Sequence, residues 1–154
     1  MISKKDNIAE YILHMWQMED LVRAFPDDEA LEQNAYLSDL KNMMRSEGVL
    51  EHGHVQLAQI AVDELNDLHR ELYDTEAPYR AAWIRLMPSI NLLKAKTDRP
   101  TMSDIEACLL LLYQIMLLRL QKREISPETA SVQQQATQVL QFLSKSYRNN
   151  EITR

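Results

Sequence analysis

The chain has 154 residues, enough for one compact domain with a substantial core, and its 45% hydrophobic content excludes a disordered chain. It contains only two glycines, which nearly excludes the glycine-rich phosphate-binding loops of nucleotide-binding folds. Its formal net charge of −6 makes nucleic acid a poor partner, because both molecules would be negatively charged.

Apolar residues recur with a helical period nearly everywhere, and strand-like alternation is almost absent. The first predicted helix covers residues 7–25 and is ended by Pro26, because proline disfavours the helical conformation in the residue before it. The second begins at Asp27 or Asp28, whose carboxylates suit a helix start. Gly48 is the predicted left-handed stop of this second helix.

The third predicted helix starts between Val49 and His54 and reaches Tyr73. The fourth covers residues 77–96 and contains Pro88. Because proline removes one backbone hydrogen bond, we expect a kink there, with the ring on the solvent side.

The fifth predicted helix, residues 103–123, starts with the capping box Ser103-Asp104-Ile105-Glu106. It is apolar almost all round, which is typical of the central helix of a bundle. The sixth helix starts at Ser126, continues to Tyr147, and leaves residues 149–154 as a tail that we expect to fray.

These helices are joined by short connections, so neighbouring helices should run antiparallel. We therefore predict an all-α fold, a single-domain bundle of five or six mostly antiparallel helices over residues 1–154. The only cysteine, Cys108, excludes an intrachain disulfide, which fits a reducing compartment. No signal-peptide-like start and no apolar run long enough for a bilayer is visible, so we expect a cytoplasmic protein without a membrane partner.

Three polar residues of complementary type fall on core-facing positions of the predicted helices: Glu19, His54 and Arg119. Removing a lone charge from water costs several kcal/mol, so we expect a buried Glu19–Arg119 ion pair with His54 hydrogen-bonded nearby. Three interpretations stay open: the network fixes helix register, it builds a ligand or catalytic site, or one of its members reaches solvent. We expect His69, by contrast, at the surface or at the rim of the core.

A metal site is a further hypothesis. Glu51 and His54 have the Glu-x-x-His spacing of carboxylate-bridged di-metal bundles, and Glu19 and Glu106 would supply further carboxylates. Such bundles need two copies of the motif, and this chain has only a single copy. The sequence therefore predicts no cofactor.

Three stretches, NIAEYILHMWQMEDLVRAF, ELNDLHREL and LLRLQKREISPET, resemble the bacterial family called domain of unknown function 4924. The resemblance covers essentially the whole chain. It implies a small soluble helical protein and supplies neither an activity nor catalytic residues.

Two functional hypotheses follow. The first is a non-enzymatic interaction or structural module that presents helix faces to a protein partner or to a second copy of itself. The eight methionines support it, because methionine-rich surfaces suit adaptable recognition. The alternative is a small-molecule- or metal-binding bundle with a site around Glu19, His54 and Arg119.

Overall fold

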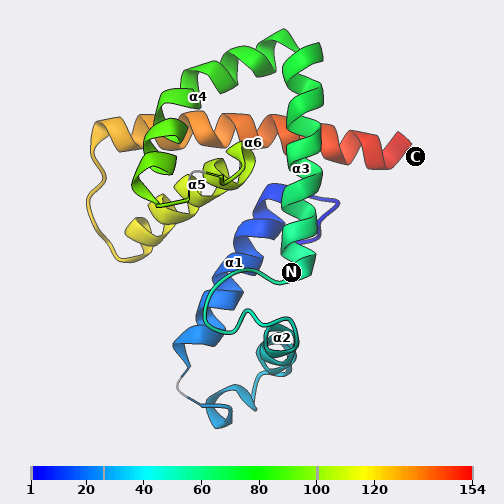
Figure 1. Ribbon diagram of the computed structural model, residues 1–154, viewed down its shortest axis with the longest axis vertical. Coiled ribbons are helices and arrows are strands. Elements are labelled where there is room, and N and C mark those ends of the chain that lie inside the picture. Colours follow the sequence, from blue (N-terminus) through cyan, green and yellow to red (C-terminus); the bar gives the residue numbers. More distant parts are fainter. Residues whose placement is uncertain (1, 26, 100, 154) are drawn as a thin grey trace.

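The computed structural model describes residues 2–25, 27–99 and 101–153. Within these ranges it contains six α-helices, one short 3-10 helix and no strand (Figure 1). The predicted all-α bundle is confirmed. The elements in chain order are α1 (Ile8–Ala24), η1 (Glu29–Leu31), α2 (Ala35–Ser46), α3 (Gln56–Thr75), α4 (Ala77–Lys96), α5 (Asp104–Leu120) and α6 (Pro127–Thr153).

The first helix is close to its prediction. Asn7 caps α1, because its side-chain oxygen accepts a hydrogen bond from the Glu10 backbone N–H at 3.1 Å. The helix ends at Ala24, and Phe25 is already extended. Pro26, the predicted cause of this ending, lies outside the described residues.

The second helix differs from its prediction. A continuous helix from Asp27 or Asp28 to Gly48 is wrong, because η1 is followed by a break at Asn34. Asn34 is extended, and its side chain accepts a hydrogen bond from the Leu37 N–H at 3.2 Å, which starts α2 afresh. Gly48 does take the predicted left-handed conformation, with a φ of 73°.

The outer lobe of the molecule consists of η1, α2 and the end of α1, which project away from the other helices in Figure 1. The buried apolar side chains of this lobe include Leu31, Leu37, Leu40 and Met44. The lobe packs mainly on α1, so α1 connects it to the bundle.

The fourth helix has the predicted bounds and the predicted proline. The ribbon of α4 changes direction along its length (Figure 1), in agreement with a kink at Pro88. Pro88 is exposed, so its ring lies on the solvent side, where the missing N–H does not deprive the core of a donor.

The fifth helix is central, since α5 packs against α1, α3, α4 and α6. Ser103 caps it by accepting a hydrogen bond from the Glu106 N–H at 3.2 Å. The core around it is aliphatic and aromatic. Its largest fully buried apolar side chains include Ile8, Ile12, Leu65, Tyr79, Leu86, Ile90, Ile105, Leu109 and Leu143.

The sixth helix is longer than predicted. The predicted helix reached Tyr147, and α6 continues to Thr153. Tyr147, Asn150 and Glu151 lie beside Leu68 and Glu71 of α3 around a shallow hollow, so the end of α6 rests on another helix. This contact supports the last turns of α6. Among the described helices, none is long and apolar enough to cross a membrane.

Candidate functional site

Glu19 is fully buried, with 0% of its surface exposed. One carboxylate oxygen accepts a hydrogen bond from the Val55 backbone N–H at 2.6 Å, and the other lies 2.8 Å from His54 Nδ1. Val55 is the residue that precedes α3. The carboxylate therefore satisfies a backbone donor at the start of α3.

Two of the three predicted network members meet, and the third does not. The Glu19–His54 contact is present, whereas the predicted Glu19–Arg119 ion pair is wrong. Arg119 is exposed, and its guanidinium donates two hydrogen bonds to Gln133 Oε1 of α6, at 2.6 and 3.1 Å. The reason is that α5 leaves the core in its last turns, so the side that is buried at Cys108 lies on an open surface at Arg119.

An aromatic stack closes the cluster around Glu19. The His54 ring lies on Trp16 with 4.5 Å between ring centroids, and the Tyr113 ring meets Trp16 edge to face. The Tyr113 hydroxyl donates a hydrogen bond to Asp20, and burial together with this carboxylate raises the Tyr113 pKa. These five residues are referred to below as the Glu19 cluster.

Arg23 fastens the segment 47–55 to α1 beside the Glu19 cluster. Its guanidinium donates hydrogen bonds to the backbone oxygens of Val49, Leu50 and Gly53 at 2.9, 3.2 and 2.6 Å. The segment therefore stays non-helical until α3 begins at Gln56, later than predicted. Glu19 and Arg23 together hold the linker between α2 and α3 in place, which is a structural role.

Of the four candidate metal ligands, Glu19 and His54 are in contact, and Glu51 and Glu106 do not join them. Glu51 and His54 lie on the non-helical segment, so the helical spacing argument does not apply to them. Glu106 binds Arg99 instead, with 2.7 Å between guanidinium and carboxylate. In the described parts of the chain, no three His, Cys, Asp or Glu side chains are grouped in a way that could hold a metal ion.

His69 lies in the core instead of at the predicted surface or rim, since it is 9% exposed. Its ring contacts Trp83 edge to face, and its Nδ1 lies 2.6 Å from the Tyr79 hydroxyl. Burial lowers the His69 pKa below its usual 6.5 and raises the Tyr79 pKa. The buried pair is therefore a neutral imidazole hydrogen-bonded to a protonated phenol.

This lowered pKa predicts a loss of stability in mild acid. The unfolded chain takes up a proton on His69 near pH 6.5, while the folded chain resists protonation until its lower pKa is reached. The His69 contribution is thus fully present above pH 6.5 and declines as the pH falls toward the folded pKa. We expect chemical denaturation midpoints to fall more steeply over this interval in the wild type than in His69→Gln. Equal pH dependence of the two proteins would contradict the assignment.

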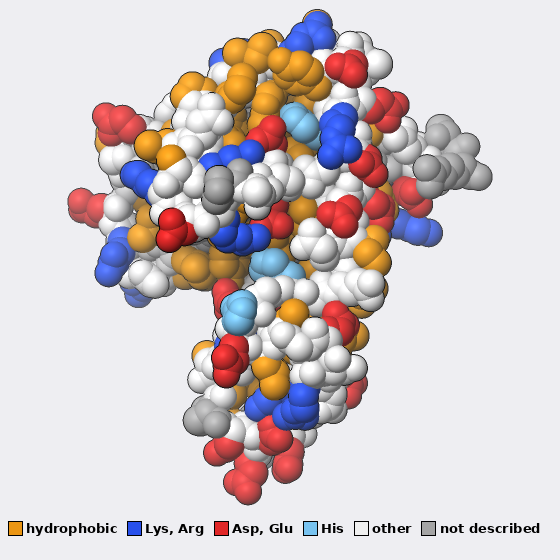
Figure 2. Space-filling model, viewed as in Figure 1, with side chains coloured by type: hydrophobic (Ala, Val, Ile, Leu, Met, Phe, Trp, Pro, Cys, Tyr) orange, Lys and Arg blue, Asp and Glu red, His pale blue; other side chains and the backbone are white. Residues whose placement is uncertain are grey.

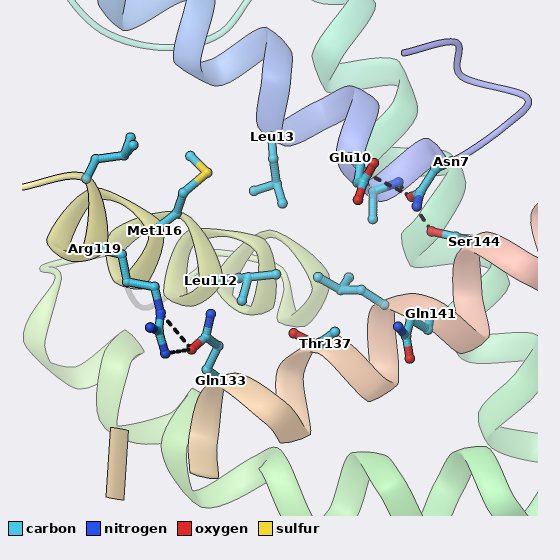
Figure 3. Close-up of a pocket in the computed structure, with 13 residues that line it drawn as sticks. Asn7, Glu10, Leu13, Leu112, Met116, Arg119, Gln133, Thr137, Gln141 and Ser144 are labelled. Atoms are coloured by element: carbon cyan, nitrogen blue, oxygen red, sulfur yellow. Dashed lines mark hydrogen bonds between the residues drawn. The ribbon is translucent and has the colours of Figure 1, made fainter. Parts of the chain in front are cut away.

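A groove lies open between α1, α5 and α6 (Figure 3). Its volume is about 420 Å³. Leu13, Leu112, Met116 and Leu140 supply apolar surface to it, and polar side chains also line it. Glu10 and Arg119 lie at opposite ends of the groove in Figure 3. The polar lining residues are Asn7, Glu10, Arg119, Gln133, Thr137, Gln141 and Ser144.

The sequence does not predict this groove, although α5 carries a signal for it. A helix that is apolar on every side needs neighbouring helices along its whole length. Where it extends beyond them, part of its apolar surface stays exposed. Leu120, in the last turn of α5, remains 60% exposed and lines the groove.

Comparison with known proteins places the chain in a family. The family model "Domain of unknown function (DUF4924)" matches two overlapping segments, residues 2–34 and 26–153. The chain belongs to this family. Neither the curated proteins nor the solved structures include a match. Membership of this family, as expected from the resemblance, identifies the chain without assigning it a reaction.

Proposed function

We propose that this DUF4924 protein is a non-enzymatic binding module that receives an amphipathic helix of a partner protein in the α1/α5/α6 groove. The observation that carries the proposal is an open groove with apolar side chains available to an incoming partner and polar side chains around it. This is the arrangement that an amphipathic helix requires, because its apolar stripe can be buried while its polar side stays in water.

The charges of the groove support a particular partner chemistry. Glu10 is exposed at one end, and Arg119 is exposed at the other. Arg119 uses its Nε and Nη2 atoms to bind Gln133, so further N–H donors remain for an incoming carboxylate. We therefore propose a partner helix with a cation toward Glu10 and a carboxylate toward Arg119.

The polar groups of the core support a binding role over a catalytic one. Burial raises the pKa of the Cys108 thiol to about 12, which keeps it protonated and unreactive. Glu19 is occupied by Val55 and His54 and has no exposed surface. We accordingly propose no small-molecule or metal site around Glu19, His54 and Arg119, and we propose that the protein acts in the cytoplasm.

The proposal is tested by fluorescence anisotropy with two labelled synthetic helical peptides that share a leucine stripe. One carries a lysine near one end and a glutamate near the other, and the second carries lysine at both ends. The wild type should prefer the first peptide, and Arg119→Glu should prefer the second. Leu120→Glu should weaken binding by about tenfold or more, because it places a charge on the apolar surface without disturbing the core.

Leu21→Glu is the matched control, since Leu21 is 40% exposed on α1 and does not line the groove. It should leave the affinity unchanged. Peptide binding that is unaffected by Leu120→Glu, or no binding by the wild type, would refute the groove as the docking site.

A further inference from the structure

The outer face of α4 is apolar along its whole length. It consists of exposed residues spaced three or four apart, which places them on one side of the helix. Ile84 and Leu92 are 49% and 57% exposed. Figure 2 shows hydrophobic side chains gathered at the upper end of the molecule, over α4. The residues of this α4 face are Ala77, Ala81, Ile84, Pro88, Leu92 and Ala95.

The charges on α4 itself are all positive, although Glu128 of α6 lines a hollow together with Leu92 and Lys96. α4 contains four cationic residues and no acidic one, in a chain whose net charge is −6. Arg80 is engaged with the Tyr73 carbonyl oxygen and Lys94 with Asp104. Arg85 and Lys96 are exposed and form no hydrogen bond or ion pair within the described part of the chain. The α4 face is therefore both apolar and basic.

The outer face of α3 has the complementary character. Leu57, Ile60, Glu64, Asp67 and Glu71 follow one another at spacings of three and four, so they share one side of the helix. Leu57 is 50% exposed and Ile60 is 44% exposed. α3 carries five acidic residues against one arginine. Of the carboxylates on this face, Glu64 binds Lys4 at 2.6 Å and Asp67 binds Arg70 at 3.3 Å, while Glu71 is exposed and borders the hollow beside the end of α6. This α3 face is therefore apolar at its start and acidic beyond it.

We propose that the α4 face of one copy docks on the α3 face of a second copy. Ile84 and Leu92 would cover Leu57 and Ile60, while Arg85 and Lys96 would meet the carboxylates of the α3 face. Such a contact joins two different surfaces, so it builds a ring or a chain of copies. It involves neither the groove nor its partner and stands independently of the proposed function.

Charge complementarity favours the α4-to-α3 contact over a symmetric contact of two α4 faces or of two α3 faces. Two α4 faces packed together would bring the unengaged Arg85 and Lys96 of both copies into one interface, and like charges in a contact cost several kcal/mol. Two α3 faces packed together would bring the Glu71 carboxylates of both copies into one interface. The α4-to-α3 contact alone covers both exposed apolar surfaces and opposes unlike charges.

The test is sedimentation velocity on the full chain from low micromolar to near-millimolar concentration. Two variants each block one face with neutral side chains: Ile84→Gln with Leu92→Gln, and Leu57→Gln with Ile60→Gln. All four positions are exposed, so both proteins should fold, which circular dichroism checks. Leu21→Gln is the control, because it removes an exposed leucine outside both faces.

The wild type and Leu21→Gln should associate with rising concentration, and each blocked variant alone should associate roughly tenfold more weakly or not at all. An equal mixture of the two blocked variants should form a dimer and nothing larger, because one intact α4 face meets one intact α3 face. A wild type that stays monomeric throughout would overturn the proposal. So would a mixture of blocked variants that remains monomeric, or a blocked variant that associates like the wild type.

Discussion

Replacing Tyr79 with alanine should lower the free energy of unfolding by about 3–5 kcal/mol. Tyr79 is 0% exposed, and its ring meets Phe142 of α6 edge to face. Its removal leaves a large cavity between α4 and α6 and also takes away the hydrogen-bond partner of His69.

Urea denaturation of Tyr79→Ala and Tyr79→Phe would measure the two contributions separately. Tyr79→Phe keeps the ring and loses only the hydroxyl, so we expect a loss of about 1–2 kcal/mol from the unsatisfied buried imidazole. If the two variants were equally stable, the ring would not hold α4 against α6 as described.

Replacing Glu19 with alanine should lower the free energy of unfolding by about 2–4 kcal/mol. The variant leaves the buried Val55 N–H without an acceptor, removes the partner of His54, and opens a cavity beneath Trp16. We also expect faster amide hydrogen exchange in the segment 47–55, because Glu19 is one of the groups that tie it to α1.

Glu19→Gln is the informative control for this residue. Glutamine keeps the shape and can still accept the hydrogen bond from Val55, so the loss should be smaller, about 1 kcal/mol. If Glu19→Ala were as stable as the wild type, the carboxylate would have no structural role, and a ligand-binding or catalytic role would have to be reconsidered.

The helical architecture could be predicted from the sequence because its signals are local. The apolar period, the Ser103 cap, the Gly48 stop and Pro88 each act within a few residues, and each has its expected consequence in the structure. Asn34 was missed although it is also a local signal, because the apolar pattern continues through it and suggests one unbroken helix.

The polar network could be predicted only in part, because it depends on where helices end relative to the core. Glu19 lies within the buried part of α1, so its position on the helical wheel correctly indicates burial. Arg119 occupies an equivalent position on α5, but at a turn beyond the core, where the same direction is exposed. A helical wheel gives the direction of a side chain and carries no information on its depth. His69 was misplaced for another reason: the buried side of α3 runs through Ala58, Val62 and His69, while Leu57 is exposed.

In this protein, the buried polar groups that stabilise the fold and the open surfaces that could bind a partner lie in different places. The buried Glu19 carboxylate and His69 ring have hydrogen-bond partners within the chain, whereas the buried indole N–H of Trp16 has none among the described residues. The open apolar surfaces, the groove and the outer faces of α3 and α4, lie elsewhere. We therefore expect substitutions in the clusters to change stability and substitutions on the surfaces to change association.

The most direct test of this separation is a map of backbone amide chemical shifts while the lysine–glutamate peptide is added to labelled protein. We predict that the largest changes occur on the parts of α1, α5 and α6 that line the groove, near Leu13, Met116 and Gln133. The segment 47–55 should change little, because Glu19 and Arg23 hold it closed. Largest changes around His54 and Val55 would contradict the account, since they would place the binding site at the Glu19 cluster.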